Sequence, residues 1–209
     1  MILESTVPRQ QERRAEDVLL AAEPDVFEDI GLQGVAAAVW QRRPEPSFQA
    51  WLDNLPARHL PTMRVVTPLE HVQSLATSAC EQAKMPDCEE RNMLIDDIAA
   101  LAFMAGNVLA CSSLRVRLDV ASNTMCPKFH LDAVPARLLC TYRGAGTEYC
   151  LEGQTSDSRG IRTVRTGSAA LFRGANWPSK ERTALLHRSP AVRGSDATRL
   201  LLVIDPVDD

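Results

Sequence analysis

The pattern of apolar residues changes near residue 112, and this change constrains the fold more than any other feature of the sequence. From Leu114, the segment LRVRLDV alternates apolar and charged residues with the two-residue period of a β-strand. Short runs bounded by Gly, Pro, Asn or Ser come after it, namely KFHLDAV, ARLLCTY, SAALF, TALLH and RLLLVID. Short strands at this spacing predict an antiparallel sandwich or barrel over residues 112–205.

The first half of the chain, residues 1–111, is predicted to be mainly helical. Apolar residues from Leu94 to Val108 recur at alternating intervals of four and three, which is the stripe of one helix. Further helices are expected over residues 9–22, 47–55 and 68–84. The run VAAAVW at 35–40 is too short to assign and fits either a strand or a helical turn.

Together the two halves predict an α+β fold in a single domain, residues 1–209. The apolar stripe of a helix must be buried, so we expect the N-terminal helices to pack on the outside of the C-terminal β-structure. Hydrophobic residues make up 45% of the chain and charged residues 24%, values that exclude a disordered chain.

Composition also limits the partners. The formal net charge of −4 argues against a nucleic-acid partner held by bulk electrostatics. No apolar stretch reaches the roughly 18 residues that a membrane span needs, and the N-terminus turns polar after three residues. We therefore expect a cytoplasmic protein with no membrane partner. The six cysteines are then expected to be free thiols, and no C-x-x-C pair suggests a zinc ribbon.

Two residues in the segment CPKFHLD could bind a metal ion. His130 and Asp132 are two positions apart, so on a strand their side chains would lie on the same face. An imidazole and a carboxylate placed this way can converge on one ion. A single H-x-D pair is common by chance, so it needs support from residues elsewhere in the chain.

A second histidine, His187, ends an apolar run further along the chain. Two His and one carboxylate form the facial triad of non-haem Fe(II) oxygenases, which leaves coordination positions open. Arg199 begins the last predicted strand, twelve residues after His187. A guanidinium there can bind a distal carboxylate through two parallel hydrogen bonds. Residue alternation alone leaves open which face of the strand Arg199 occupies.

The sequence around these residues resembles two known protein families. The order H-x-D, then TGSAALFRG, then His187 and a basic residue resembles the cupin-like double-stranded β-helix of Fe(II)/2-oxoglutarate oxygenases, over residues 114–205. More closely, CPKFHLD with RLLCTYRGAGTEY and HRSP resembles a bacterial family known as domain of unknown function 1826, over most of the chain. Association of that family with zinc-homeostasis genes implies a link to zinc-handling proteins.

The oxygenase resemblance implies a role for each matching residue. His130, Asp132 and His187 match the metal ligands, and Arg199 matches the residue that holds the distal carboxylate of 2-oxoglutarate. The cosubstrate pocket also takes a polar side chain from an earlier strand, for which Tyr142 is the first candidate and Asn123 and Thr141 are others. The implied metal is Fe(II), with Zn(II) as the alternative. The substrate, a small molecule or a protein, is left unnamed.

Three functions therefore remain open on the sequence. The first is a mononuclear Fe(II)/2-oxoglutarate-type oxygenase. The second is a non-catalytic zinc-binding module, in which Cys126 would complete a tetrahedral site if Pro127 bends the chain back. The third is a metal-free structural domain. Clustering of His130, Asp132 and His187 would argue against the third, and a Cys126 sulfur in the same cluster would favour zinc.

Overall fold

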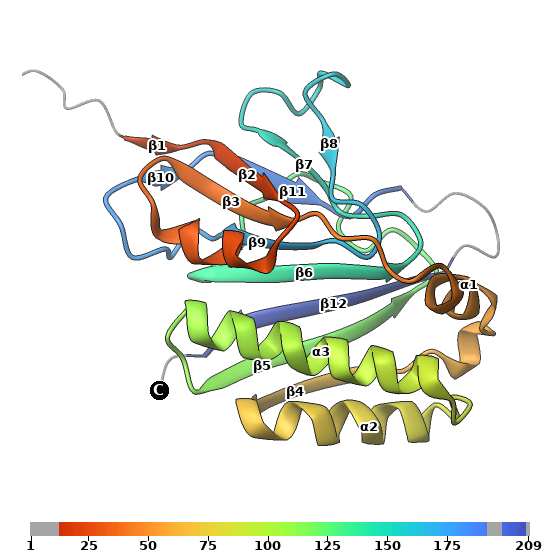
Figure 1. Ribbon diagram of the computed structural model, residues 1–209. Helices are drawn as coiled ribbons and strands as arrows, with labels where there is room; N and C mark the ends of the chain where they lie inside the picture. Colours follow the sequence, from red (N-terminus) through yellow and green to blue (C-terminus); the bar gives the residue numbers. More distant parts are fainter. Residues whose placement is uncertain (1–12, 192–197, 208–209) are drawn as a thin grey trace, which may run out of the picture.

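The computed structural model describes residues 13–191 and 198–207, and its main element is a seven-stranded sheet (Figure 1). Neighbouring strands are antiparallel, except that β2 and β3 are parallel. Across the sheet the order is β2 (Asp17–Ala21), β3 (Val35–Trp40), β9 (Ala169–Arg173), β6 (Ala136–Arg143), β12 (Arg199–Pro206), β5 (Ser113–Ala121) and β4 (Met63–Pro68).

A smaller antiparallel sheet lies over part of one face of the large one (Figure 1). Its strands are β11 (Leu185–Arg188), β7 (Glu148–Leu151) and β8 (Arg162–Thr163). Apolar side chains from both sheets form a shared cluster that includes Tyr149, Leu185, Phe172 and Val203. A short parallel pair, β1 (Arg14–Ala15) and β10 (Arg182–Thr183), lies beside them. The strands thus form two packed layers.

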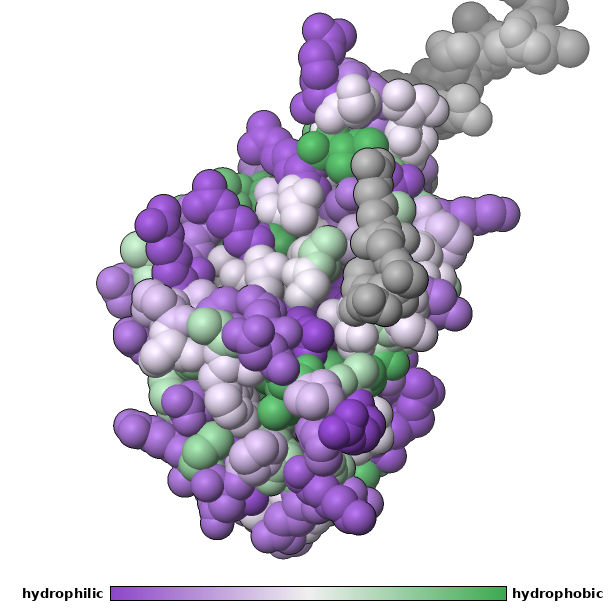
Figure 2. Space-filling view, turned by 90° about the vertical axis from the view of Figure 1, so that its right-hand side faces the viewer, coloured by the Kyte–Doolittle hydropathy of each residue, from purple (hydrophilic) through white to green (hydrophobic). Residues whose placement is uncertain are grey.

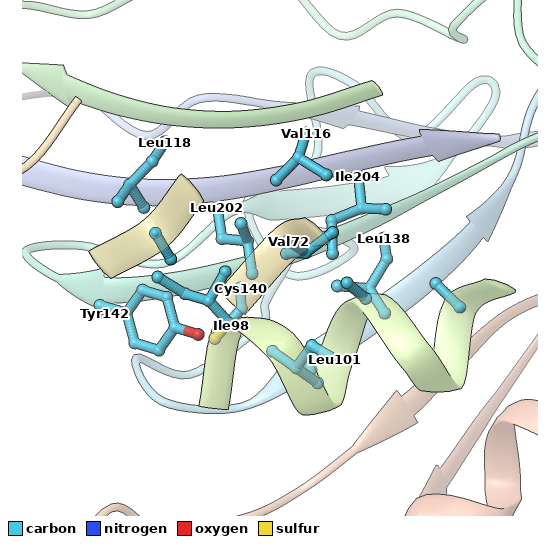
Figure 3. Packing of buried hydrophobic residues seen from close by; sticks show 14 of the residues in the cluster. Val72, Ile98, Leu101, Val116, Leu118, Leu138, Cys140, Tyr142, Leu202 and Ile204 are labelled. Atoms are coloured by element: carbon cyan, nitrogen blue, oxygen red, sulfur yellow. The ribbon is translucent and has the colours of Figure 1, made fainter. Parts of the chain in front are cut away.

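The helices cover the opposite face of the large sheet (Figure 1). The α-helices are α1 (Pro46–Asn54), α2 (Val72–Gln82) and α3 (Glu89–Val108), with 3-10 turns η1 (Pro24–Gly31), η2 (Ala57–His59) and η3 (Leu69–His71). The predicted stripe of α3 is buried: Ile98 and Leu101 pack against Leu138 and Leu202 of the sheet (Figure 3). Burial of this stripe fixes α3 on the sheet.

Strand β12 is buried on both faces. Leu200, Leu202 and Ile204 belong to the cluster on the helix side, whereas Leu201 and Val203 belong to the cluster on the small-sheet side. The uninterrupted apolar run LLLVI at 200–204 therefore has a simple cause, since the middle of a strand between two buried faces needs apolar residues on both of them.

One predicted helix of the first half is replaced by strands in the structure, and another begins slightly later than expected. Residues 14–15 and 17–21, inside the expected helix 9–22, form β1 and β2. Thr67 and Pro68, expected to begin the helix 68–84, end strand β4 instead. The rest of that helix is confirmed, as the 3-10 turn η3 followed by α2. Both segments lie at sheet edges, where pairing with β3 or β5 outweighs local propensity and where Pro is tolerated. The first half therefore contributes strands as well as helices.

The surface seen from the right-hand side of Figure 1 is mostly hydrophilic, with apolar residues only in small patches (Figure 2). Within residues 13–191 and 198–207, no helix is long and apolar enough to span a membrane.

Candidate metal centre

The three predicted metal ligands come together at the edge of the small sheet. His187 lies on β11, and the connection between β5 and β6 brings His130 alongside it as an isolated antiparallel bridge. Each of these two residues donates its backbone N–H to the carbonyl oxygen of the other, at 3.0 Å. Asp132 is two residues further along, and one ligand atom from each residue lies within 4.8 Å of the other two.

A hydrogen bond to the backbone orients the ring of His130, so that its other ring nitrogen faces this cluster. Its Nδ1 lies 2.9 Å from the carbonyl oxygen of Lys128. A carbonyl can only accept, so Nδ1 carries the proton, and Nε2 of the neutral ring is left with a lone pair. That Nε2 lies 3.7 Å from Asp132 Oδ1. Fixing one ring nitrogen through a backbone carbonyl is the usual way a histidine ligand is oriented.

His187 and Asp132 face each other across the same point. The Nε2 atom of His187 lies 3.0 Å from Asp132 Oδ2. This oxygen is nevertheless buried without a hydrogen-bond partner among the described residues, because the contact lacks hydrogen-bond geometry. A buried carboxylate oxygen with no donor, facing an imidazole nitrogen, is what a divalent cation between the two would require. The donor set of two His and one Asp fits such an ion.

The charge of Asp132 suits this role. Burial opposes its ionisation, but the contact with His187 and the positive charge of Arg137 outweigh burial and lower the pKa of Asp132. Asp132 is therefore ionised at neutral pH. An ionised carboxylate is the form that binds a metal ion.

A salt-bridge chain holds the other oxygen of Asp132. Arg137 Nη1 lies 2.5 Å from Asp132 Oδ1. Arg137 in turn donates from Nε and Nη2 to the two oxygens of Asp205, at 2.6 and 2.8 Å, and the Asp205 side chain is only 1% exposed. The fork-to-fork pairing with Asp205 orients the guanidinium, which leaves Oδ2 of Asp132 as the oxygen free to bind an ion.

Arg199 faces the same cavity as these ligands. It shares a face of β12 with Leu201 and Val203, and all three line the cavity. Arg199 is 3% exposed, and its Nη2 donates to the hydroxyl oxygens of Thr141 and Thr147 at 3.0 and 2.8 Å.

Two further contacts of Arg199 are to neutral oxygens. Its Nε donates to the carbonyl oxygen of Ala145 at 2.9 Å, and Nη1 lies 3.5 Å from Ser189 Oγ. Within the described residues Arg199 has no carboxylate partner at salt-bridge distance. Burial lowers the pKa of Arg199 to about 10, and the charge of Asp119 opposes that shift. Arg199 is still a cation at neutral pH, so the cavity contains a buried positive charge paired only with dipoles.

Tyr142, the first candidate for the cosubstrate pocket, does not line the cavity that contains the three ligand residues. Leu138, Cys140 and Tyr142 alternate onto the helix side of β6. The Tyr142 ring lies there (Figure 3), and its hydroxyl donates to Asp97 Oδ2 at 2.7 Å. Its neighbour Thr141 faces the cavity instead. Asn123, the other candidate, is exposed.

One contributor, Thr147, was missed by the sequence interpretation. It lies just before β7, and no motif marks a threonine whose role is to bind an arginine from another strand. Gly144, by contrast, has a backbone reason to be glycine. Its φ is +82°, and a Cβ there would lie 3.2 Å from the Cα of Arg199. The loop that carries Thr147 can thus approach Arg199 closely.

The cavity has a volume of about 120 Å³. Cys126 lines it but is exposed and lies outside the cluster of three ligands. Within the described residues, the structure therefore shows a three-ligand group and no tetrahedral site closed by Cys126. The lining residues are Arg117, Asp119, Met125, Cys126, His130, Asp132, Arg137, Leu139, Thr147, His187, Arg188, Ser189, Arg199, Leu201 and Val203.

Comparison with solved structures identifies the type of fold. A dioxygenase for auxin oxidation from Arabidopsis thaliana, solved with 2-oxoglutarate, aligns at a TM-score of 0.55 and 9% identity, covering 93% of each chain. The corresponding rice dioxygenase aligns at 0.48 and 14%, covering 92% of this chain and 83% of that one. At such identities the first likeness shows the fold alone: a mixed, sheet-rich α+β fold similar to that of 2-oxoglutarate oxygenases.

A bacterial structure is also similar. A prolyl-4-hydroxylase from Pseudomonas putida aligns at a TM-score of 0.41 and 14% identity, covering 89% of this chain and 98% of that one. No curated protein matches the sequence significantly. The family model described as "Protein of unknown function (DUF1826)" matches residues 21–205, nearly the whole chain. The chain therefore belongs to the DUF1826 family.

Proposed function

We propose that this protein is a mononuclear Fe(II)- and 2-oxoglutarate-dependent oxygenase built on a double-stranded β-helix. One observation carries the proposal. The cavity that contains the His130, Asp132 and His187 ligand atoms also contains Arg199, a buried cation with no carboxylate partner among the described residues. A metal site alone would not need this arginine, and a fold without ligands would gain nothing from burying it.

His130, Asp132 and His187 would hold the metal. Three protein ligands leave coordination positions open, unlike the four of a closed structural zinc site. A bound Fe(II) would supply dioxygen activation coupled to the oxidation of a 2-oxo acid. The protein supplies orientation: the Lys128 carbonyl fixes the tautomer of His130, and Arg137 fixes the carboxylate of Asp132.

Arg199 would bind the distal carboxylate of 2-oxoglutarate. Hydrogen bonds from its Nε and Nη2 to Ala145, Thr141 and Thr147 fix the plane of the guanidinium before the ligand arrives. The incoming carboxylate would supply the negative charge that the cavity lacks. A charge-assisted pair in a buried site is stronger than one in water, which favours a dicarboxylate over a neutral ligand.

The alternative, a non-catalytic zinc-binding module, rests on Cys126. This residue lines the same cavity, so a shift of the segment before His130 could add a fourth ligand. That alternative gives Arg199 no ligand to bind. The two proposals therefore differ in whether the metal-loaded protein binds 2-oxoglutarate.

Anaerobic purification and metal analysis, with a calorimetric titration of 2-oxoglutarate, test the proposal. We expect one divalent metal per chain and 2-oxoglutarate binding that depends on the metal. Succinate, measured after exposure to air, should accumulate slowly even without a substrate. Bound zinc together with no affinity for 2-oxoglutarate would favour the zinc module and exclude the oxygenase.

A further inference from the structure

The four arginines that line the cavity differ in how well they are paired. Arg137 is bound by both Asp132 and Asp205. Arg188 donates to Glu148 at 2.7 Å and lies over the ring of Phe129, 4.2 Å from its centroid. These two arginines are neutralised within the protein and have little attraction left for a ligand.

The other two are Arg199 and Arg117. Under the proposed function, Arg199 binds 2-oxoglutarate. Arg117 has one acidic neighbour, Asp119, and the nearest pair of atoms, Nη1 and Oδ2, lies 3.9 Å apart. That distance is beyond hydrogen-bond range. Arg117 Nε and Asp119 Oδ2 are both buried without a hydrogen-bond partner among the described residues.

Arg117 and Asp119 are oppositely charged, line the same cavity and have unused hydrogen-bonding atoms. A ligand with one anionic and one cationic group would pair with both. Buried polar atoms in native proteins nearly always have partners, so those that lack one mark places where a ligand can act. Arg117 and Asp119 are two residues apart on β5 and share its cavity face. Asp119 also lies 3.4 Å from Arg64 Nη2, which keeps its carboxyl oriented on the strand.

We propose that Arg117 and Asp119 bind the primary substrate, and that this substrate is a small α-amino acid. Its carboxylate pairs with Arg117 and its ammonium group with Asp119. The 3.9 Å between the two side chains matches groups attached to the same carbon better than groups at the ends of a long chain. This inference rests on the proposed function, because Arg199 is taken to be occupied by 2-oxoglutarate.

A binding experiment with matched probes tests the inference. Protein loaded with Mn²⁺ and 2-oxoglutarate is titrated calorimetrically with each of the standard L-amino acids, and then with the amide and the N-acetyl derivative of each one that binds. We expect binding of at least one amino acid. Removing either charge from the probe should weaken binding at least about tenfold, the scale of one charge-assisted hydrogen bond.

Variants assign the two contacts. Arg117→Ala and the longer Arg117→Gln should each weaken amino-acid binding at least about tenfold, and the amide should then bind about as well as the acid. Asp119→Asn should remove the preference for a free ammonium group. Arg115→Ala is the matched control, because Arg115 is an exposed arginine on the same strand and does not line the cavity. Its affinity should be unchanged.

The outcomes separate this inference from the proposed function. If 2-oxoglutarate binds but no amino acid does, or if Arg117→Ala leaves amino-acid binding intact, the inference is wrong and the oxygenase proposal stands. If Arg117→Ala weakens 2-oxoglutarate binding as much as Arg199→Lys does, Arg117 belongs to the cosubstrate site and the inference is again wrong. Amino-acid binding that needs Arg117, without any affinity for 2-oxoglutarate, would instead contradict the oxygenase proposal alone.

Discussion

The two faces of the seven-stranded sheet both contain partly buried charges, and the group around Asp97 on the helix face is paired more fully than the charges on the cavity face. On the helix face, Asp97 accepts hydrogen bonds from Arg42 at 2.5 and 2.7 Å and from the Tyr142 hydroxyl at 2.7 Å. Both of its oxygens are used. On the cavity face, Asp132 Oδ2 has no donor and Arg199 has no carboxylate partner among the described residues.

This difference separates structural charges from those available to ligands. In the group of Arg42, Asp97 and Tyr142, the hydrogen bonds and ion pairs offset the free-energy cost of desolvation. The group also holds α3 and the segment after β3 against β6. On the cavity face, one oxygen of Asp132 has no donor and Arg199 has no carboxylate partner in the described part of the chain. The free-energy cost of burying these two charges is offset only when a ligand binds. Adjacent residues of β6 show the division: Thr141 contacts Arg199 on one side, and Tyr142 contacts Asp97 on the other.

The largest expected effect is the loss of the metal. His130→Ala removes one of three ligands from a half-exposed position, so metal content should fall to background while the circular dichroism spectrum is retained. Asp97→Asn, a change to the acid on the helix face, should leave metal content unchanged. Metal analysis after dialysis measures both variants. Full stoichiometry in His130→Ala would show that the metal, if any, is bound elsewhere.

The next effect concerns Asp205, which contacts no ligand atom of the metal centre. Asp205→Asn weakens the hold on Arg137, so the carboxylate of Asp132 is less well oriented. Metal affinity should fall by about 10- to 100-fold, the range found for partners of metal ligands. Asp96→Asn, on the surface of α3, serves as the matched change. Equal metal affinities of Asp205→Asn and Asp96→Asn would mean that Asp205 does not contribute to the orientation of Arg137.

A smaller effect is expected for Arg199→Lys, which keeps the charge but loses the planar guanidinium that Ala145, Thr141 and Thr147 hold in place. Affinity for 2-oxoglutarate should fall at least about tenfold, or roughly 1.5 kcal/mol. Metal content should be unchanged, which distinguishes this variant from His130→Ala. Calorimetry on the metal-loaded protein gives the affinity for 2-oxoglutarate, and metal analysis gives the metal content. Unaltered affinity would move support to the zinc-module alternative.

On the helix face the expected effect is on stability instead of binding. Arg42→Met leaves Asp97 without its main partner and should lower the free energy of unfolding by about 2 kcal/mol, less than for a fully buried pair because both side chains are partly exposed. Affinity for 2-oxoglutarate should stay within about twofold of wild type. Urea denaturation gives the first quantity. A larger loss of 2-oxoglutarate affinity would show that the two faces are coupled.

The smallest effect is a pH dependence. Burial, with the nearby charge of Asp97, raises the pKa of Tyr142 well above its ordinary value of 10.0. The folded state thus keeps a proton that the unfolded state releases, so this stability is fully present below pH 10 and is lost as the pH rises further. Tyr142→Phe should make the unfolding free energy less sensitive to pH between about 9 and 11. The same alkaline loss in both proteins would assign it to other groups.

The sequence predicted best those features that arise from local periodicity. The stripe from Leu94 to Val108 predicted α3, and most of the runs after residue 112 predicted strands of the second half. The run KFHLDAV is the exception, because it forms only an isolated bridge at His130. The edge strands of the first half could not be predicted, since β2 forms by pairing with β3 and its own residues favour a helix as readily. A Pro at the end of an edge strand looks the same in sequence as a Pro at the start of a helix.

The candidate site was predictable to the extent that a motif marks it. The H-x-D pair and His187 could be found because their residue types are chemically distinctive, although only the fold shows that a backbone bridge joins the two histidines. The sequence interpretation named Tyr142 ahead of Thr141, although alternation along β6 puts Tyr142 on the face of Leu138 and Cys140 and leaves Thr141 on the cavity face. The pairing of Arg137 with Asp205 joins strands far apart in the chain and has no sequence signal.

The measurement that tests the central claim most directly is a calorimetric titration of 2-oxoglutarate into the wild-type protein, with and without one equivalent of Mn²⁺, repeated with His130→Ala. Because the unpaired charges lie on the cavity face, we predict saturable binding of 2-oxoglutarate that needs both the metal and His130. Binding that is absent with the metal present, or binding by the metal-free protein or by His130→Ala that is as tight as that of the metal-loaded wild type, would contradict the assignment of the cavity as a metal and 2-oxoglutarate site.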